Sequence, residues 1–189
     1  MQTQSDYSSI SPAKQKTVTT FRLVGWMAFW LELALALASG LVLLFAISGQ
    51  NFAAETNAGI GIGIFWAIGG VIALLFNTFL AFRYTRIAKG LENPNTDRHP
   101  KKGDTVQLLR LGLIVGLVGI FLCLVGAGST SGVLVAKAVS QPPGVAISDP
   151  NRIIRALDVF VEVANINGIA ANFVAVLTSL GLLNWIQSE

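Results

Sequence analysis

The stretch that decides the fold is residues 111–128, which reads LGLIVGLVGIFLCLVGAG. It holds no Asp, Glu, Lys or Arg, and it reaches the roughly 18 apolar residues that indicate a membrane-crossing helix. Three further apolar stretches, 23–47, 58–82 and 163–186, contain one charged residue among them, Glu32. Because hydrocarbon offers the backbone no water to bond, such spans must be helices. The sequence therefore predicts an all-α integral membrane four-helix bundle with spans at about residues 23–47, 58–82, 108–130 and 160–186.

Composition agrees with a membrane protein and argues against an enzyme. Of the 189 residues, 53% are hydrophobic and 12% are charged, against about 25% charged in soluble domains. One cysteine excludes an intramolecular disulfide, and one histidine with two methionines argues against a soft-metal site. No nucleophile–base pair or phosphate-binding loop is evident. We expect no catalytic residues, no cofactor, a polar tail over residues 1–21 and a single membrane domain over residues 22–187.

The distribution of cationic residues predicts the orientation. Of the 13 Lys and Arg, three lie at 14–22, seven at 83–110 and three at 137–155. The positive-inside rule then places both termini and a basic loop, residues 83–107, on the cytoplasmic side, with a hairpin at 131–158 on the other. Cleavage of the first span as a signal peptide near residues 36–38 is an alternative that leaves three spans. The length of that span and its Glu32 favour retention.

The third span carries a stripe of small residues at heptad-like spacing. Its members are Gly112, Gly116, Gly119, Cys123 and Gly126, which follow one another at intervals of four, three, four and three. Hydrophobicity does not join helices inside lipid, whereas small residues let helix backbones approach closely. The pattern predicts a left-handed seam at which this helix packs against its neighbours.

Glu32, Asn77 and Asn172 form a candidate polar site inside the membrane. An acidic residue near mid-bilayer costs at least about 2.5 kcal/mol, and no Lys or Arg lies at a similar depth. We expect the three side chains to approach one another and Glu32 to be protonated and neutral. They form either a cation- or proton-binding site on a transport path or a hydrogen-bonded clamp between helices, and the close-packed glycines favour the clamp.

Other polar residues have simpler interpretations. Asp158 and Glu162 lie one turn apart near Arg155 and predict a helix-surface pair, with a metal site as a weak alternative. His99 is expected to be a solvated loop residue. The basic loop is interpreted as a determinant of topology, with contact to anionic lipid as the alternative. A nucleic-acid partner is not expected, because aromatic residues are not interleaved with the cations.

Three segments together resemble a known family. They are residues 22–30 (RLVGWMAFW), 133–139 (VLVAKAV) and 156–161 (ALDVFV), in this order within a four-span plan. The chain resembles the family of a small chloroplast inner-envelope protein, described both as an import-translocon component and as a permease in chloroplasts. The resemblance implies a role in protein import or membrane-complex assembly, or in iron transport. With a leader of only about twenty residues, the chain looks like a cyanobacterial member of the thylakoid or plasma membrane.

Three functional hypotheses follow. The first is a non-enzymatic scaffold or assembly factor, whose partners are the lipid bilayer and other membrane proteins or further copies of itself. The second is a transporter of iron or another cation that uses Glu32, Asn77 and Asn172. The third and weakest is a role in pigment or lipid handling.

Overall fold

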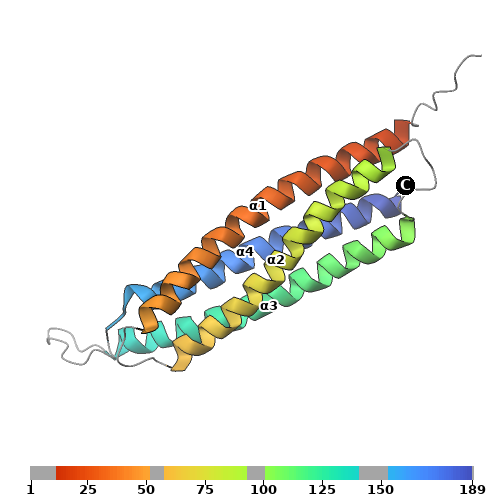
Figure 1. The fold of residues 1–189 in the computed structure, drawn as a ribbon. Helices are drawn as coiled ribbons and strands as arrows, with labels where there is room; N and C mark the ends of the chain where they lie inside the picture. Colours follow the sequence, from red (N-terminus) through yellow and green to blue (C-terminus); the bar gives the residue numbers. More distant parts are fainter. Residues whose placement is uncertain (1–11, 52–57, 93–100, 141–152, 189) are drawn as a thin grey trace, which may run out of the picture.

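The computed structural model describes residues 12–51, 58–92, 101–140 and 153–188. Within these residues, four helices run up and down through an elongated bundle (Figure 1). They are α1 (Pro12–Asn51), α2 (Ala58–Glu92), α3 (Lys102–Val139) and α4 (Ala156–Ser188). All four are long and apolar enough to cross a membrane. This confirms the prediction of an all-α protein with four membrane-spanning helices.

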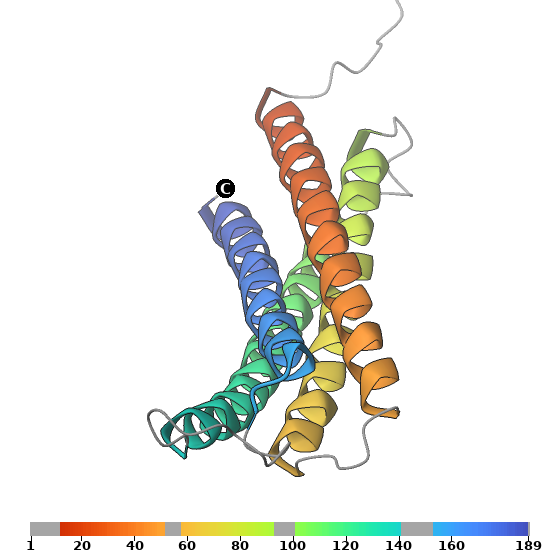
Figure 2. The ribbon, with the colours of Figure 1, turned by 90° about the vertical axis from the view of Figure 1, so that its left-hand side faces the viewer.

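The four helices are neighbours in a ring, with one diagonal contact. α1 packs against α2 and α4, α3 packs against the same two helices, and α2 also meets α4 across the centre. In Figure 2, α3 crosses α4 and α1 crosses α2 at a visible angle. Such crossings are expected where side chains at heptad spacing interlock between helices.

The helices extend beyond the predicted spans. They contain 40, 35, 38 and 33 residues, or about 50–60 Å each, against a hydrocarbon core of about 30 Å. α1 begins at Pro12, inside the segment expected to be a polar tail, and proline is well suited to the first turn of a helix. The segment 83–107, expected to be a loop, is helical up to Glu92 and again from Lys102. The sequence contains no proline from residue 13 to 93, so the backbone continues in a helix past the apolar stretch.

The ends of the connection between the third and fourth helices, expected to be a hairpin, are also helical. α3 continues to Val139, and the backbone N–H of Ser140 donates to the carbonyl of Ala136 as the helix ends. α4 begins at Ala156, so the expected hairpin at 131–158 is helical at its two ends. His99, like residues 141–152, lies outside the described residues.

The stripe of small residues on α3 is the inner face of that helix. Its buried residues are Thr105, Leu109, Gly112, Gly116, Gly119, Cys123, Gly126, Thr130 and Lys137, spaced almost throughout by three or four. α1 buries a similar stripe that includes Gly25, Ala28, Glu32 and Ala36, and continues it at Ser39. Small residues of α1 and α3 therefore lie toward the neighbouring helices.

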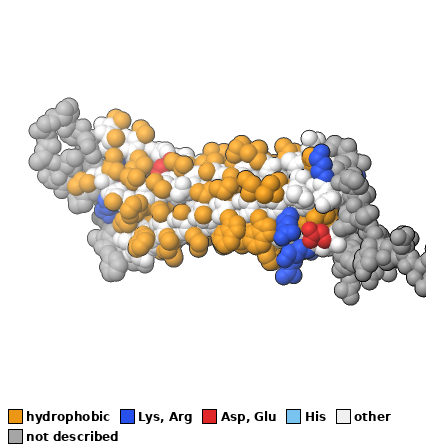
Figure 3. All heavy atoms as spheres, turned by 90° about the horizontal axis from the view of Figure 1, so that it is seen from above, with side chains coloured by type: hydrophobic (Ala, Val, Ile, Leu, Met, Phe, Trp, Pro, Cys, Tyr) orange, Lys and Arg blue, Asp and Glu red, His pale blue; other side chains and the backbone are white. Residues whose placement is uncertain are grey.

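Large apolar side chains cover the outside of the bundle. On α1 the exposed ones extend from Leu23 to Phe45, and Trp30 is 61% exposed. Figure 3 shows hydrophobic side chains over the length of one face, with Lys and Arg gathered toward its ends. In water such a surface is expected to associate, whereas in a bilayer it faces acyl chains.

Two glycines of α3 provide a matched test of the packing. A methyl group at Gly119 overlaps the buried Asn172 amide, whereas one at Gly128 meets nothing within 4 Å. We expect Gly119→Ala to destabilise the folded protein by about 1–3 kcal/mol through overpacking. Gly128→Ala should be neutral or slightly stabilising, because alanine favours the helix. Unfolding of both variants in detergent measures this, and equal stabilities would contradict the packing described for α3.

Candidate functional site in the bundle interior

Asn77 joins α2 to the backbone of α3. With its amide oriented to satisfy both groups, Nδ2 donates to the carbonyl of Gly112 and Oδ1 accepts from the N–H of Gly116, each at 3.1 Å. Asn77 is 3% exposed. The missing side chains at Gly112 and Gly116 allow this approach, so a polar residue of one helix bonds the main chain of another.

Asn172 and Asn165 of α4 make the same two kinds of hydrogen bond, one within α4 and one to α2. The Nδ2 of Asn172 donates to the carbonyl of Gly168 on its own helix at 2.9 Å and to that of Gly70 on α2 at 3.4 Å. Seven residues earlier, the Nδ2 of Asn165 donates to the carbonyls of Val161 at 3.0 Å and Gly63 at 3.5 Å. Both asparagines are fully buried.

The glycines on α3 complete the same two layers. A methyl group at Gly119 would overlap the Asn172 amide, and one at Gly126 would overlap the Asn165 amide. The sulfur of Cys123 lies between these layers, against Gly70 of α2 and Gly168 of α4. Each layer therefore combines an asparagine of α4 with glycines of α2 and α3.

Glu32 lies in the α1 part of the interior. Its side chain is 1% exposed, and the Thr78 hydroxyl of α2 interacts with its carboxyl while donating to the Leu74 carbonyl at 2.9 Å. Its Oε2 has no hydrogen-bond partner among the described residues. Within the part of the chain that the structure describes, no hydrogen bond joins Glu32 to Asn77 or Asn172.

The structure therefore brings together part of the predicted polar site. The Asn77 amide and the backbone of Asn172 both border Gly116 on α3. Glu32 belongs to α1, which packs against α2 and α4. The depth of a residue, which the sequence supplies, does not determine which neighbouring helix its side chain meets.

Apolar layers enclose Glu32 along the bundle axis. One turn later on α1, Ala36 packs with Leu74 and Ala171 in a buried cluster. One turn earlier, Ala28 belongs to a buried cluster that also contains Leu80, Ala81 and Tyr84. The carboxyl thus lies between two apolar layers built from several helices.

The acidic residues at the start of α4 face α3. Asp158 forms a buried ion pair with Lys137, with Nζ and Oδ2 2.5 Å apart, and the backbone N–H of Arg155 donates to the same oxygen at 3.1 Å. Glu162 accepts hydrogen bonds from the hydroxyls of Thr130 and Ser131. The expectation of an acidic pair on the helix surface near Arg155 was wrong, because both carboxylates bond side chains of α3.

This polar end of the α3–α4 seam is absent from the predicted site. The sequence spacing could have indicated it. Lys137 lies seven residues after Thr130, and Asp158 lies seven residues before Asn165, so both continue the heptad stripes.

At the other end of the seam, the Tyr84 and Ser179 hydroxyls lie 3.1 Å apart against Gly112. Among the described residues, no group of three or more His, Cys, Asp or Glu is placed to hold a metal ion.

Comparison of the chain with known proteins finds a matching family model and a chloroplastic relative. A family model described as protein of unknown function (DUF3611) matches residues 11–187. The chain is also 29% identical over 183 residues to a protein of Arabidopsis thaliana named Protein TIC 21, chloroplastic. The match covers 93% of this chain and 60% of the relative, so this chain spans about 60% of the relative's length. No solved structure matches the chain. The family resemblance drawn from the sequence is thereby confirmed.

The buried ion pair gives a sharp test of the α3–α4 seam. Lys137→Met leaves the Asp158 carboxylate buried without its partner, and we expect a loss of about 3–5 kcal/mol in unfolding free energy. The double variant Lys137→Met/Asp158→Asn removes both charges and should recover much of that loss. Unfolding of the two single variants and the double variant in detergent measures the coupling. Strictly additive losses would argue against the ion pair.

Proposed function

We propose that this chain, which belongs to the family described as protein of unknown function DUF3611, is a membrane scaffold or assembly factor without enzymatic activity. In this role it binds other membrane proteins, or further copies of itself, through the outer faces of its helices. The chloroplastic relative supports a membrane role linked to import or permeation. We further propose the thylakoid or plasma membrane of a cyanobacterium as its location, which immunodetection in separated membrane fractions tests.

The observation that carries the proposal is the closed interior. Asn77, Asn165 and Asn172 bond the backbones of neighbouring helices. Glu32 lies between apolar layers. A transport path needs polar groups that face a space through which ions pass, whereas these groups face packed helices. Their arrangement supports a rigid bundle whose working surface is its outside.

An aromatic cluster on α1 and α2 is a suitable part of that outer surface. The Trp26 and Trp30 rings stack at 6.2 Å, and Phe29 contacts Trp30 at 5.3 Å and Phe82 at 5.9 Å between ring centroids. The Arg86 guanidinium lies 5.1 Å from the Phe82 ring centroid. Aromatic and arginine side chains supply much of the binding energy at protein interfaces.

Cation transport is the second candidate, and a specific observation favours it. Glu32 Oε2 and Ser39 Oγ have no hydrogen-bond partner among the described residues, and both lie on the buried stripe of α1. Unpaired oxygens in a buried stripe are suited to receive a proton or cation. In this alternative, iron or another cation passes by Glu32, with Asn77 and Asn172 on the path.

The orientation is proposed from charge. At the end of the bundle that holds the start of α1, cations outnumber acids among the side chains that the structure describes. There are eight cations (Lys16, Arg22, Arg83, Arg86, Lys89, Lys101, Lys102 and Arg110) and two acids (Glu92 and Asp104). At the other end, Lys137 and Arg155 balance Asp158 and Glu162. The positive-inside rule supports both termini on the cytoplasmic side.

Single-cysteine labelling tests the orientation, because the one native cysteine, Cys123, is buried. We expect Lys101→Cys to react with an impermeant maleimide only after the membrane is opened. Ser48→Cys, at the opposite end of α1, should react in intact cells when the chain is in the plasma membrane. Reaction of Lys101→Cys in intact cells would contradict the proposed topology.

Transport assays distinguish the two candidate functions. In proteoliposomes we expect no ferrous-iron uptake above protein-free vesicles for the native chain or for Glu32→Gln, which keeps the size of the side chain. Uptake by the native chain that is lost in Glu32→Gln would overturn the scaffold proposal in favour of transport.

Site-specific crosslinking tests the scaffold directly. A photo-crosslinking phenylalanine analogue at the exposed position Trp30 should form adducts with specific membrane proteins, whereas the same analogue at the exposed position Leu44, outside the aromatic cluster, should form fewer. Equal adducts at the two positions would argue against recognition by the aromatic cluster.

A further inference from the structure

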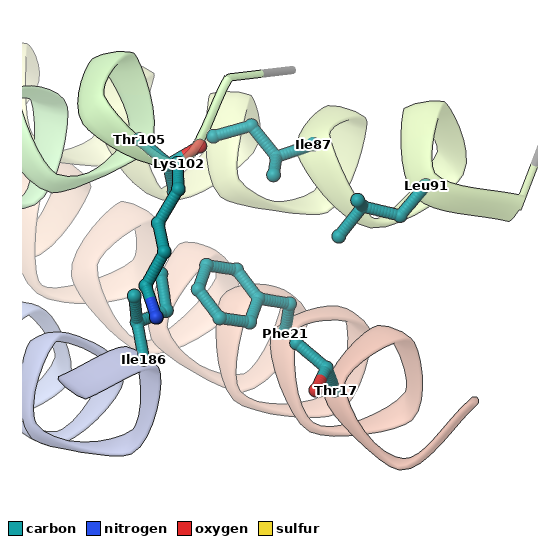
Figure 4. A pocket seen from close by; sticks show the side chains of 7 residues that line it. All are labelled: Thr17, Phe21, Ile87, Leu91, Lys102, Thr105 and Ile186. Carbon is teal, nitrogen blue, oxygen red and sulfur yellow. The ribbon is translucent and has the colours of Figure 1, made fainter. Parts of the chain in front are cut away.

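A pocket of about 310 Å³ lies at the basic end of the bundle, apart from the asparagine layers. Its apolar lining comes from three helices: Phe21 of α1, Ile87 and Leu91 of α2, and Ile186 of α4. Figure 4 shows the Lys102 side chain extending from α3 toward Phe21 and Ile186. The volume is at the lower end of the range for small-molecule sites.

Among the described residues, the polar part of the lining consists of Lys102, Thr105 and Thr17. Lys102 is exposed, and it belongs to neither of the ion pairs found among the described residues. The Thr105 hydroxyl donates to the Lys101 carbonyl at 3.2 Å. The described lining of the pocket therefore combines apolar walls with one ammonium group.

The pocket adjoins the lipid-facing surface. Phe21 lies two residues, or about 3 Å of helix rise, from Leu23, where the exposed apolar surface of α1 begins. Beside Ile186, the Lys16 ammonium lies 5.3 Å from the centroid of the Trp185 ring. Tryptophan and lysine together are typical of the level at which lipid headgroups lie.

We propose that this pocket binds one anionic membrane lipid, with its headgroup phosphate or sulfonate on Lys102 and part of an acyl chain against Phe21, Ile87, Leu91 and Ile186. Basic pockets between membrane helices are suited to anionic headgroups, and the excess of cations at this end raises the local concentration of such lipids. A zwitterionic lipid loses this advantage. A free anion gains the charge contact but leaves the apolar walls uncovered.

The site is independent of whether the protein is a scaffold or a transporter. Its test uses the purified full chain in detergent, titrated with dioleoyl phosphatidylglycerol, and counts bound lipid by native mass spectrometry. We expect one phosphatidylglycerol to be retained in preference to dioleoyl phosphatidylcholine. Lys102→Gln should weaken retention about fivefold, as expected for loss of one cation beside an anionic headgroup.

Lys101→Gln is the matched control, since Lys101 is an exposed neighbour of equal charge that does not line the pocket. It should leave retention nearly unchanged. Leu91→Trp should displace the acyl chain by filling the pocket without altering charge, and circular dichroism checks that each variant remains folded.

Three results would overturn the proposal. Equal losses in Lys102→Gln and Lys101→Gln would indicate diffuse attraction to the surface. Equal retention of phosphatidylcholine would remove the requirement for an anionic headgroup. Displacement of the lipid by millimolar glycerol phosphate would identify a site for a free anion, because the acyl chain would then contribute nothing.

Discussion

The register of α3 on α4 is the constraint on which the rest of the bundle depends. Gly119 faces Asn172, and Gly126 faces Asn165, seven residues along each helix. In lipid, helices are held by close packing and hydrogen bonds, since their surfaces are no more apolar than the acyl chains. A slip of one residue would bring Val118 or Ile120 toward the Asn172 amide. The repeat of small residues against amides therefore selects one alignment among many apolar ones.

The unpaired oxygens of these asparagines have a local explanation. Both amide hydrogens of Asn165 and Asn172 are directed to carbonyls, while Oδ1 of each has no N–H or O–H partner among the described residues. In each case Oδ1 lies where a side chain at Gly126 or Gly119 would begin. It therefore faces the Cα–H of that glycine, and such contacts contribute about 0.5–1 kcal/mol each. Glycine thus provides both the space and a weak donor.

The sequence predicts more of the fold than of the site because the two depend on different information. Apolar length and heptad spacing are properties of one segment, so they indicate the four helices and the inner face of α3 without knowledge of the neighbours. The grouping of Glu32, Asn77 and Asn172 depends on which neighbouring helix each side chain faces. Asn77 bonds the backbone of α3, whereas Glu32 lies on α1, which packs against α2 and α4. The ends of the helices were also hard to predict, because a helix does not stop where the membrane does.

The two ends of the bundle are closed by different interactions. At one end, the Lys137–Asp158 ion pair and the hydrogen bonds to Glu162 join α3 to α4. At the other, four helices surround a pocket, and the one surface ion pair among the described residues joins Arg22 and Glu92 at 3.6 Å. Exposed ion pairs of this kind contribute little to the free energy of folding. Separating a buried pair leaves a buried charge without its counter-ion. Among the described residues, the pocket and the excess of cations therefore lie at the end that lacks a buried ion pair.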